Sequence, residues 1–364
     1  MCPVLMQPFW WEHINCTKNN EGGGVKTALF GANKENKKVF LSIVIPQFNE
    51  DEEKIQPLLR SIRGQIRVNW DEIEIIIVND GGEDSYPLDP KFLRSYAFPH
   101  IEYLHLDKNY GAGLAREVGI GKAQGGYIMF CDADDMLYSV DSLMGITEEL
   151  HKETYDMLMC DFMREVPEGL QLIQKGLTWM HGKVYRKQWL IENDVHFHQR
   201  IRRNEDTYFN SIIAHLNAKI GWVEKPVYVW QRNDQSITQR KDYSKGDAAC
   251  MVQVANYICL ELVNRNLPVG EVVYQTAVSA WFKADKGNRM VAKILKDFIR
   301  YWWKETESIN EEKKNEMYEF ERDRLKAVVP LYRENGNFNK FVKKVLKEKE
   351  NDAGRIDGAD NKTA

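Results

Sequence analysis

The chain has 364 residues, enough for one large domain with an accessory part or for two domains. Hydrophobic residues make up 43% of it, so a sizeable core is possible, and the net charge of -4 argues against a generally basic nucleic-acid-binding protein. No run of about 18 apolar residues occurs, so we expect no transmembrane segment. The N-terminus lacks the features of a secretory signal. Six scattered cysteines without a Cys-x-x-Cys pair are typical of reduced thiols in a cytoplasmic protein.

Residues 1–38 differ in character from the rest of the chain. They carry no sustained hydrophobic period, and they contain Gly22-Gly-Gly24 and a polar stretch at 33–38. This composition predicts a loop-rich N-terminal arm. Its aromatic residues Phe9, Trp10 and Trp11 are candidates to anchor the arm on the rest of the protein.

A regular alternation begins at Val39. Short apolar and β-branched runs predict strands over 39–45, 73–78, 101–106 and 127–131, and helical spacing of apolar residues predicts helices over 52–66 and 111–124. Strands that alternate with helices predict an α/β fold whose mostly parallel sheet carries helices on both faces. We expect this domain to cover residues 39–244.

Residues 245–349 are predicted to be helical, with segments at 248–263, 272–282, 290–304 and 313–329. A Lys-rich segment, 340–349, leads to a polar tail over 350–364 that we expect to be disordered. The C-terminal helices could mediate oligomerisation. The lysines could dock on an anionic polymer or membrane surface, or could simply form a solvated helical face.

Polar clusters follow three of the predicted strands: Gln47-Phe-Asn-Glu50, Asn79-Asp80 and Asp132–Asp135. In open α/β sheets, ligands bind beyond the carboxyl ends of the strands. The convergence of these clusters therefore predicts a binding site at that edge of the sheet.

The helix after Gly111 is not a dinucleotide-binding helix, because Arg116 stands where the third glycine of that pattern should be. Gly111, Ala115, Gly119 and Ala123 instead recur every four residues and form a smooth stripe, which lets a helix lie close on the sheet. Arg116 lies next to this stripe. It could contact a phosphate, or it could lie on a solvated face.

Asp132 and Asp134 are alternate residues at a strand end, so both can point towards one ligand. Oxygen ligands suit Mg²⁺ and Mn²⁺, which commonly bridge carboxylates to substrate phosphates. The alternative is a solvated turn in which Asp135 caps the next helix. Asp80 can likewise cap a turn, or it can bind a base or ribose through charge-assisted hydrogen bonds.

Glu205 and Asp206 precede an apolar helix predicted over 208–216. Acidic residues are favoured at a helix N-terminus, and one of this pair could alternatively act as a general base. His196 and His198 could share one face of a strand, but no third ligand of suitable spacing follows. We expect them to be structural.

Four segments together resemble the ordered signature of family 2 glycosyltransferases, over roughly residues 40–240. They are Leu41-Ser-Ile-Val-Ile-Pro-Gln-Phe-Asn-Glu50, Ile77-Val-Asn-Asp-Gly-Gly82, Asn109-Tyr-Gly-Ala-Gly-Leu-Ala-Arg-Glu-Val-Gly-Ile120 and Gly126-Tyr-Ile-Met-Phe-Cys-Asp-Ala-Asp-Asp135. His181–Arg186, Glu205-Asp206 and residues 230–238 resemble later motifs of the family. The resemblance implies a GT-A fold, nucleotide-sugar donors and inversion of the anomeric centre.

The resemblance also implies how the donor is bound. Pro46, Phe48 and Glu50 would cradle the nucleoside, with Phe48 against the base. Asp80 would hold the base edge, and Arg116 would face the diphosphate or ribose.

The resemblance assigns the chemistry to the acidic residues. Asp132 and Asp134 match the family's DxD motif and would hold the metal ion, Mn²⁺ or Mg²⁺, with Asp134 as the direct ligand. Asp206 matches the general base, and Glu205 would orient or assist it. Gln47 and Glu117 depart from the residues often found at their positions, which leaves the donor open.

These expectations add up to a metal-dependent inverting glycosyltransferase that uses a nucleotide diphosphate-sugar, with a UDP-sugar as the first choice. The acceptor stays open among a glycan, a polymer, a protein and a modified nucleic acid. No QxxRW motif is present, so resemblance to processive polysaccharide synthases is poor.

Two other functions remain as alternatives. A sugar nucleotidyltransferase would carry an early Gly-rich loop, whereas this chain has Pro46-Gln-Phe-Asn-Glu50 there. A non-catalytic nucleotide-sugar-binding scaffold on the same fold is disfavoured because every expected acidic position is filled.

Overall fold

The computed structural model describes residues 26–30, 39–81, 87–233, 243–284, 289–326 and 337–360. The backbone divides into two compact units, residues 1–233 and residues 234–364. The sequence places the corresponding boundary between residues 244 and 245. Phe9, Trp10 and Trp11, for which an anchoring role is predicted, lie outside the described residues.

The centre of the first unit is made of strands that are apolar along their whole length. β2 (Leu41–Gln47) and β3 (Ile73–Asn79) are buried at all seven positions and pair in parallel. β5 (Tyr127–Phe130) and β4 (Ile101–His105) continue the parallel pairing on either side. Strands that are buried on both faces need helices on both faces of the sheet.

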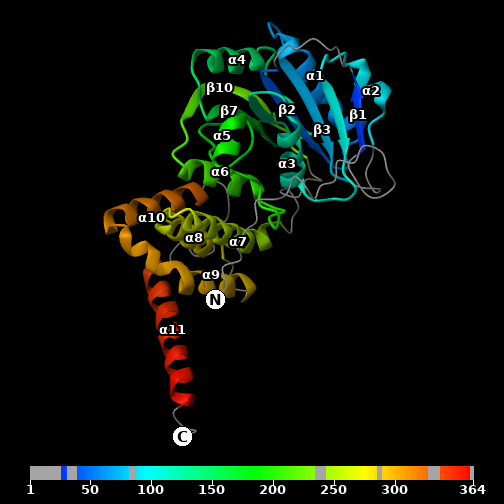
Figure 1. The fold of residues 1–364 in the computed structure, drawn as a ribbon. Helices are drawn as coiled ribbons and strands as arrows, with labels where there is room; N and C mark the ends of the chain where they lie inside the picture. Colours follow the sequence, from blue (N-terminus) through cyan, green and yellow to red (C-terminus); the bar gives the residue numbers. More distant parts are fainter. Residues whose placement is uncertain are drawn as a thin grey trace. The chain divides into compact units, whose positions relative to one another are not determined.

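Helices cover these strands on both sides (Figure 1). α1 (Glu52–Arg63) and α4 (Ser142–Lys152) share one core cluster with the odd-numbered apolar residues of β2 and β3. α3 (Ala112–Lys122) lies on the opposite face, where Gly119 meets the side chain of Val44. The stripe of small residues therefore has the predicted effect of letting α3 approach the sheet closely.

The other half of the sheet is largely antiparallel, so the described sheet is mixed. Its order is β1-β4-β3-β2-β5-β9-β7-β10-β6, with β8 paired to β7. The predicted α/β fold with helices on both faces is confirmed, while mainly parallel pairing holds only for the half around β2. The remaining elements of this unit are β1 (Lys26–Phe30), η1 (Trp70–Glu72), α2 (Pro90–Ser95), β6 (Met136–Leu137), β7 (Met157–Val166), β8 (Gly169–Ile173), β9 (Lys183–Arg186), α5 (Lys187–Glu192), α6 (Glu205–His215) and β10 (Ile220–Trp230).

Part of the predicted N-terminal arm belongs to the sheet. β1 pairs antiparallel with β4, with Lys26 opposite His105 and Phe30 opposite Ile101. Residues 26–30 therefore form an edge strand and not a loop. A run of five residues is too short to show a reliable period, which explains why the sequence did not reveal it.

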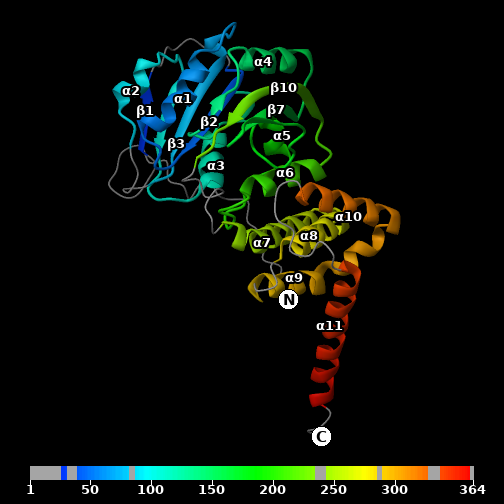
Figure 2. The same cartoon turned by 180° about the vertical axis from the view of Figure 1, so that it is seen from behind.

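The second unit is helical, as the sequence predicts. Its central helix is α8 (Gly270–Lys283), in which every residue from Thr276 to Phe282 is buried. α7 (Tyr243–Asn264), α9 (Arg289–Trp302), η4 (Trp303–Ser308) and α10 (Glu311–Lys326) pack against it, and α11 (Phe338–Asp360) packs against α9 (Figures 1 and 2). In the described parts of the chain, no helix is both long enough and apolar enough to span a bilayer.

α11 extends further than expected. It continues through residues 350–360, which belong to the segment 350–364 that the sequence predicts to be disordered. The prediction rests on the lack of apolar residues there. These residues continue a helix that already exists, so they extend it without the cost of nucleating a new one.

We predict that Gly119→Ala lowers the free energy of unfolding by about 1–3 kcal/mol. The added Cβ would lie 2.2 Å from Cγ1 of Val44, so α3 would have to move away from β2. Gly145→Ala in α4 is the matched control. An added Cβ there meets nothing within 4 Å, and the free energy of unfolding should rise by about 0.5–1 kcal/mol. Urea unfolding measures both changes, and equal effects would contradict the close approach.

Candidate active site

The carboxyl ends of the central strands meet at one edge of the sheet. Gln47 at the end of β2 lies opposite Asn79 at the end of β3, and the amide of Asp80 donates to the Gln47 carbonyl at 2.8 Å. On the other side of β2, the amide of Cys131 donates to the Val44 carbonyl at 3.0 Å. The three polar segments picked out in the sequence therefore lie together.

Arg116 joins two acidic segments that are far apart in the chain. Its guanidinium nitrogens lie 2.6 Å from Oδ1 of Asp132 and 2.7 Å from Oε1 of Glu205. The side chain is only 4% exposed, which excludes a solvated face. A buried cation is costly unless it is paired, so the two carboxylates are what stabilise Arg116 in this position. Its Nε atom is buried without a hydrogen-bond partner.

Asp132 and Asp134 are both partly exposed, whereas Ala133 between them is buried in the core. The two carboxylates therefore leave the loop on the side opposite Ala133. Burial alone would raise the pKa of Asp132, but the guanidinium of Arg116 outweighs it and lowers this pKa. Burial raises the pKa of Asp134, whose Oδ2 accepts a hydrogen bond from the side-chain nitrogen of Asn233 at 2.7 Å.

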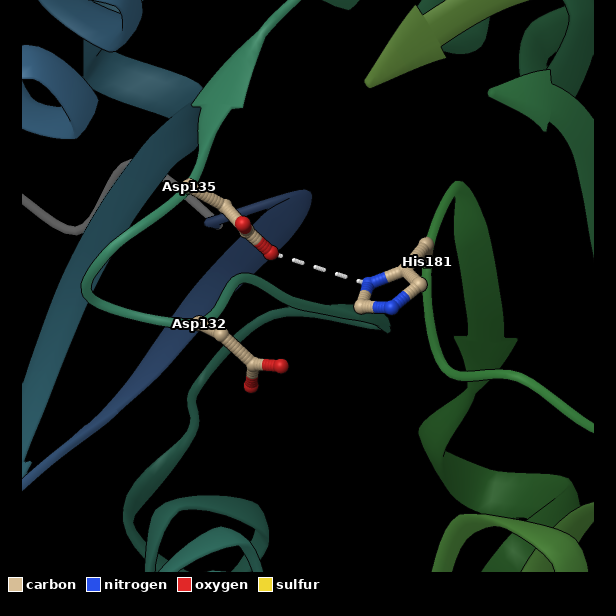
Figure 3. A group of neighbouring side chains, drawn as sticks. All are labelled: Asp132, Asp135 and His181. Atoms are coloured by element: carbon tan, nitrogen blue, oxygen red, sulfur yellow. Dashed lines mark ion pairs between the residues drawn. The ribbon is translucent and has the colours of Figure 1, made fainter. Parts of the chain in front are cut away.

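Asp135 forms a buried cluster with Tyr228 and His181. The Tyr228 hydroxyl donates to Oδ2 of Asp135 at 2.7 Å and accepts from the amide of Asp132 at 2.9 Å. The ring of His181 stacks on Tyr228, and its Nδ1 lies 3.7 Å from Oδ2 of Asp135 (Figure 3). Burial raises the pKa of Asp135 well above its ordinary value and lowers that of His181 to about 4.

The alternative that Asp135 caps the next helix is wrong. The N-cap position of α4 is occupied by Asp141, and Asp135 accepts hydrogen bonds from the Tyr228 hydroxyl and, at 2.8 Å, from the amide of Gln231. Both donors come from the end of β10, almost a hundred residues further along the chain, so no local pattern could indicate them.

The donor atoms at this edge fit a divalent cation. One oxygen each of Asp132 and Asp135 and a ring nitrogen of His181 lie within 4.8 Å of one another (Figure 3). Carboxylate oxygens suit Mg²⁺ and Mn²⁺, and imidazole is acceptable to transition metals. This group shares Asp132 with the predicted metal pair but does not include Asp134.

The residues expected to cradle a nucleoside surround the end of β2. Pro46 is buried within the strand, while the Phe48 ring is 41% exposed. The amide of Phe48 donates to the Glu50 carboxylate at 2.5 Å. Burial, reinforced by the charge of Asp134, raises the pKa of Glu50 to about 7. An exposed aromatic ring of this kind is suited to stacking against a base.

Asp80 fixes the turn that leads into α3. Its two carboxylate oxygens accept hydrogen bonds from the amides of Tyr110 at 2.6 Å and Gly111 at 2.7 Å. Gly111 has a φ of 96°, a conformation that favours glycine. Asp80 therefore holds a distant turn and not its own: beside it, Oδ1 of Asn79 accepts the hydrogen bond from the amide of Gly81 at 3.0 Å. A base contact would have to use its remaining lone pairs. Burial raises the pKa of Asp80 to about 6.

Glu205 and Asp206 open α6, next to Arg116. Glu205 is engaged by the guanidinium, whereas Oδ1 of Asp206 accepts a hydrogen bond from the Thr207 amide at 2.7 Å. Burial, together with the neighbouring charge of Glu205, raises the pKa of Asp206 to about 7. A carboxylate of this kind is partly ionised at neutral pH and binds a proton more readily than an ordinary aspartate.

The two histidines contact different neighbours: the ring of His198 packs against Tyr208, whereas His196 lies between two carboxylates. His196 lies 2.7 Å from Glu117 and 3.0 Å from Asp194, and these carboxylates raise its pKa to about 9. Tyr228, by contrast, carries no role in the sequence prediction. Its only indication there is its position two residues before Trp230, at the start of the closing segment that resembles the family.

We predict that Arg116→Gln lowers the free energy of unfolding by about 3–5 kcal/mol, because Asp132 and Glu205 lose their shared cation in a buried site. Lys225→Gln is the matched control. Lys225 pairs with Asp141 at 2.6 Å on the surface, where an ion pair contributes only about 0–1 kcal/mol. Chemical unfolding of both variants tests this, and similar losses would mean that the Arg116 pairs are energetically ordinary.

The sequence profile described as Glycosyl transferase family 2 matches residues 42–209. The chain is 41% identical over 213 residues to the "Uncharacterized glycosyltransferase YwdF" of Bacillus subtilis, an alignment that covers 58% of this chain and 71% of that protein. It is 27% identical over 270 residues to the "Uncharacterized glycosyltransferase YibD" of Escherichia coli, covering 64% of this chain and 74% of that protein.

The chain is also similar to the poly(ribitol-phosphate) beta-N-acetylglucosaminyltransferase TarS of Staphylococcus aureus. The two are 24% identical over 243 residues, which cover 62% of this chain and 41% of TarS. A crystal structure of TarS matches this fold with a TM-score of 0.53 at 18% identity, over 79% of this chain and 53% of that one. The chain therefore belongs to glycosyl transferase family 2 and is a glycosyltransferase with the GT-A fold.

Proposed function

We propose that this glycosyltransferase moves a sugar from a nucleotide diphosphate-sugar, a UDP-sugar in the first instance, to an acceptor hydroxyl with inversion, and that it uses Mn²⁺ or Mg²⁺. The observation that carries the proposal is the pairing of Arg116 with both Asp132 and Glu205. It brings the acidic strand end and the acidic start of α6 to one edge of the sheet, so a donor bound at the first and an acceptor bound at the second can meet.

The donor is held by residues on the strand ends. Phe48 stacks on the base, with Pro46, Glu50 and Asp80 around the nucleoside. Arg116 faces the diphosphate. Guanidinium groups recognise phosphate oxygens through charge-assisted hydrogen bonds.

Asp132 and Asp134 would hold the divalent ion, with Asp135 and His181 next to them as further possible ligands. When bound, it supplies Lewis-acid stabilisation of the charge on the departing nucleoside diphosphate. Tyr228 keeps the loop in place by binding the amide of Asp132.

Asp206 is the general base. Its oxygen accepts the proton of the acceptor hydroxyl while that oxygen attacks the anomeric carbon from the side opposite the diphosphate, which inverts the configuration. Glu205 is already bound by Arg116 and orients the pair. The pKa of Asp206 of about 7 suits a base that must release its proton again at neutral pH.

The acceptor is a hydroxyl of a glycan or polymer, which the name of TarS supports. A cytoplasmic location is supported by the free thiols of Cys131, Cys160 and Cys259. Oligomerisation through the C-terminal helices stays a prediction.

Asp206→Asn is expected to lower kcat by about 10²–10⁴-fold and to leave the affinity for UDP unchanged, because the side chain faces the acceptor. In the unaltered enzyme kcat/KM should fall as the pH drops below about 7, since the base is then protonated. Product formation across pH and titration calorimetry with UDP measure these effects.

Asp323→Asn on α10 is the control. Undiminished turnover of Asp206→Asn would rule out this residue as the base.

Removal of divalent ions is expected to abolish transfer, and added Mn²⁺ should restore it. Asp134→Asn should raise the Mn²⁺ concentration needed for half-maximal activity by about 10–100-fold, an effect of the size seen when metal-site partners are lost. Transfer at full rate in excess chelator would overturn the metal requirement while leaving the base assignment intact.

A further inference from the structure

Two helical segments of the second unit carry most of their charge with one sign. Residues 289–304, which include α9, contain five Lys or Arg and one Asp. Residues 338–349, the first half of α11, contain five Lys and one Glu, whereas residues 350–360 of the same helix contain one Arg and four acidic residues. The whole chain has a net charge of -4, so this concentration of cations stands out. We propose that these helices form a docking surface for an anionic phospholipid bilayer. We call it the basic surface: Arg289, Lys293, Lys296, Arg300, Lys340, Lys343, Lys344 and Lys347.

On α9 the cations form one stripe. Arg289, Lys293, Lys296 and Arg300 are spaced by four, three and four residues, which places them on one side of a helix. The apolar residues that face the bundle are buried: Val291, Leu295, Phe298, Ile299 and Trp302. The stripe is therefore the solvent side of a helix that is already packed, and it does not need to be buried to complete the fold.

α11 repeats the pattern. Lys340, Lys343, Lys344 and Lys347 are exposed and follow the i, i+3, i+4, i+7 spacing of a single helical face. The opposite face packs through Phe338, Val342 and Val345, which are all buried. The two helices touch through Glu348, whose Oε2 lies 3.0 Å from Nζ of Lys296 and 3.3 Å from a guanidinium nitrogen of Arg300.

Most of the basic surface lacks a counter-charge. Lys296 and Arg300 both pair with Glu348, and Arg300 also lies 3.5 Å from Asp297 of its own helix. In the described ranges no ion pair involves Arg289, Lys293 or the four exposed lysines of α11. On α10, by contrast, Lys314 pairs with Glu311, Arg322 with Glu319 and Arg324 with Glu321. Like charges at one-turn spacing repel, so an external anion would stabilise the surface.

Exposed apolar side chains favour a bilayer over a soluble polyanion. Tyr301 is 72% exposed and Met290 is 59% exposed, and they flank the α9 stripe near its two ends. Tyrosine and aliphatic side chains next to Lys and Arg suit the headgroup region, where the apolar part is buried and the charged groups stay in water. A polyphosphate chain would interact with the charges alone. An anionic bilayer attracts each nearby Lys or Arg and can also bury the ring of the tyrosine.

The test is co-sedimentation of the full chain with vesicles of pure phosphatidylcholine and with vesicles of phosphatidylcholine mixed with anionic phosphatidylglycerol. Binding should require phosphatidylglycerol and weaken with salt. Replacing Lys340, Lys343, Lys344 and Lys347 by Gln should lower the partition coefficient by at least about tenfold. The control changes four exposed cations of the first unit to Gln: Arg60, Arg67, Lys91 and Lys152. Equal losses in both variants would overturn the proposal.

Two further measurements separate the alternatives. Tyr301→Ser should weaken vesicle binding by about 2–10-fold without affecting retention on soluble polyphosphate. A chain that binds polyphosphate through the four lysines but ignores the vesicles would show a polyanion site and overturn the bilayer assignment. UDP affinity, measured on the same variants, should stay unchanged, which shows that they are folded and keeps this result separate from the proposed transfer reaction.

Discussion

One buried cation, Arg116, organises the whole edge of the sheet. Its pairs with Asp132 and Glu205 connect the loop after β5 to the start of α6, through a side chain that belongs to α3. These elements come from three separate parts of the chain. Without the guanidinium, the carboxylates on both sides would repel one another in a poorly solvated space. The close packing of α3 on β2 through Gly119 matters for this reason, since it sets the depth at which Arg116 lies.

The same arrangement sorts the acidic residues by protonation. Arg116 lowers the pKa of Asp132, whereas burial raises that of Asp206 to about 7 and that of Glu50 to about 7. Carboxylates with separated pKa values in one site can take different tasks, one as a permanent anion and another as a proton acceptor. The difference between these pKa values follows from burial and from the nearest charges, which are Arg116 for Asp132, Glu205 for Asp206 and Asp134 for Glu50.

Features that depend on local pattern could be predicted from the sequence. These features are the apolar runs of β2 and β3, the polar residues at their ends and the small-residue stripe of α3. Each can be recognised within a few neighbouring residues. Partners that are distant in sequence could not. Tyr228 meets Asp135 across 93 residues, and Arg116 meets Glu205 across 89. The pattern around Asp80 predicted a cap of its own turn or a contact with a base or ribose, whereas its carboxylate binds the amides of Tyr110 and Gly111, 30 and 31 residues further along the chain.

The acidic loop has little freedom to vary in length. Only five residues separate β5 from β6. Within this loop, the amide of Cys131 is hydrogen-bonded to β2, the amide of Asp132 to Tyr228 and the carboxylate of Asp135 to the amide of Gln231. Inserting one residue into this loop would move a carboxylate into the buried position that Ala133 now occupies. The turn after β2 is freer to vary. Phe48 there is 41% exposed, so a substitution at this position leaves the charged centre in place.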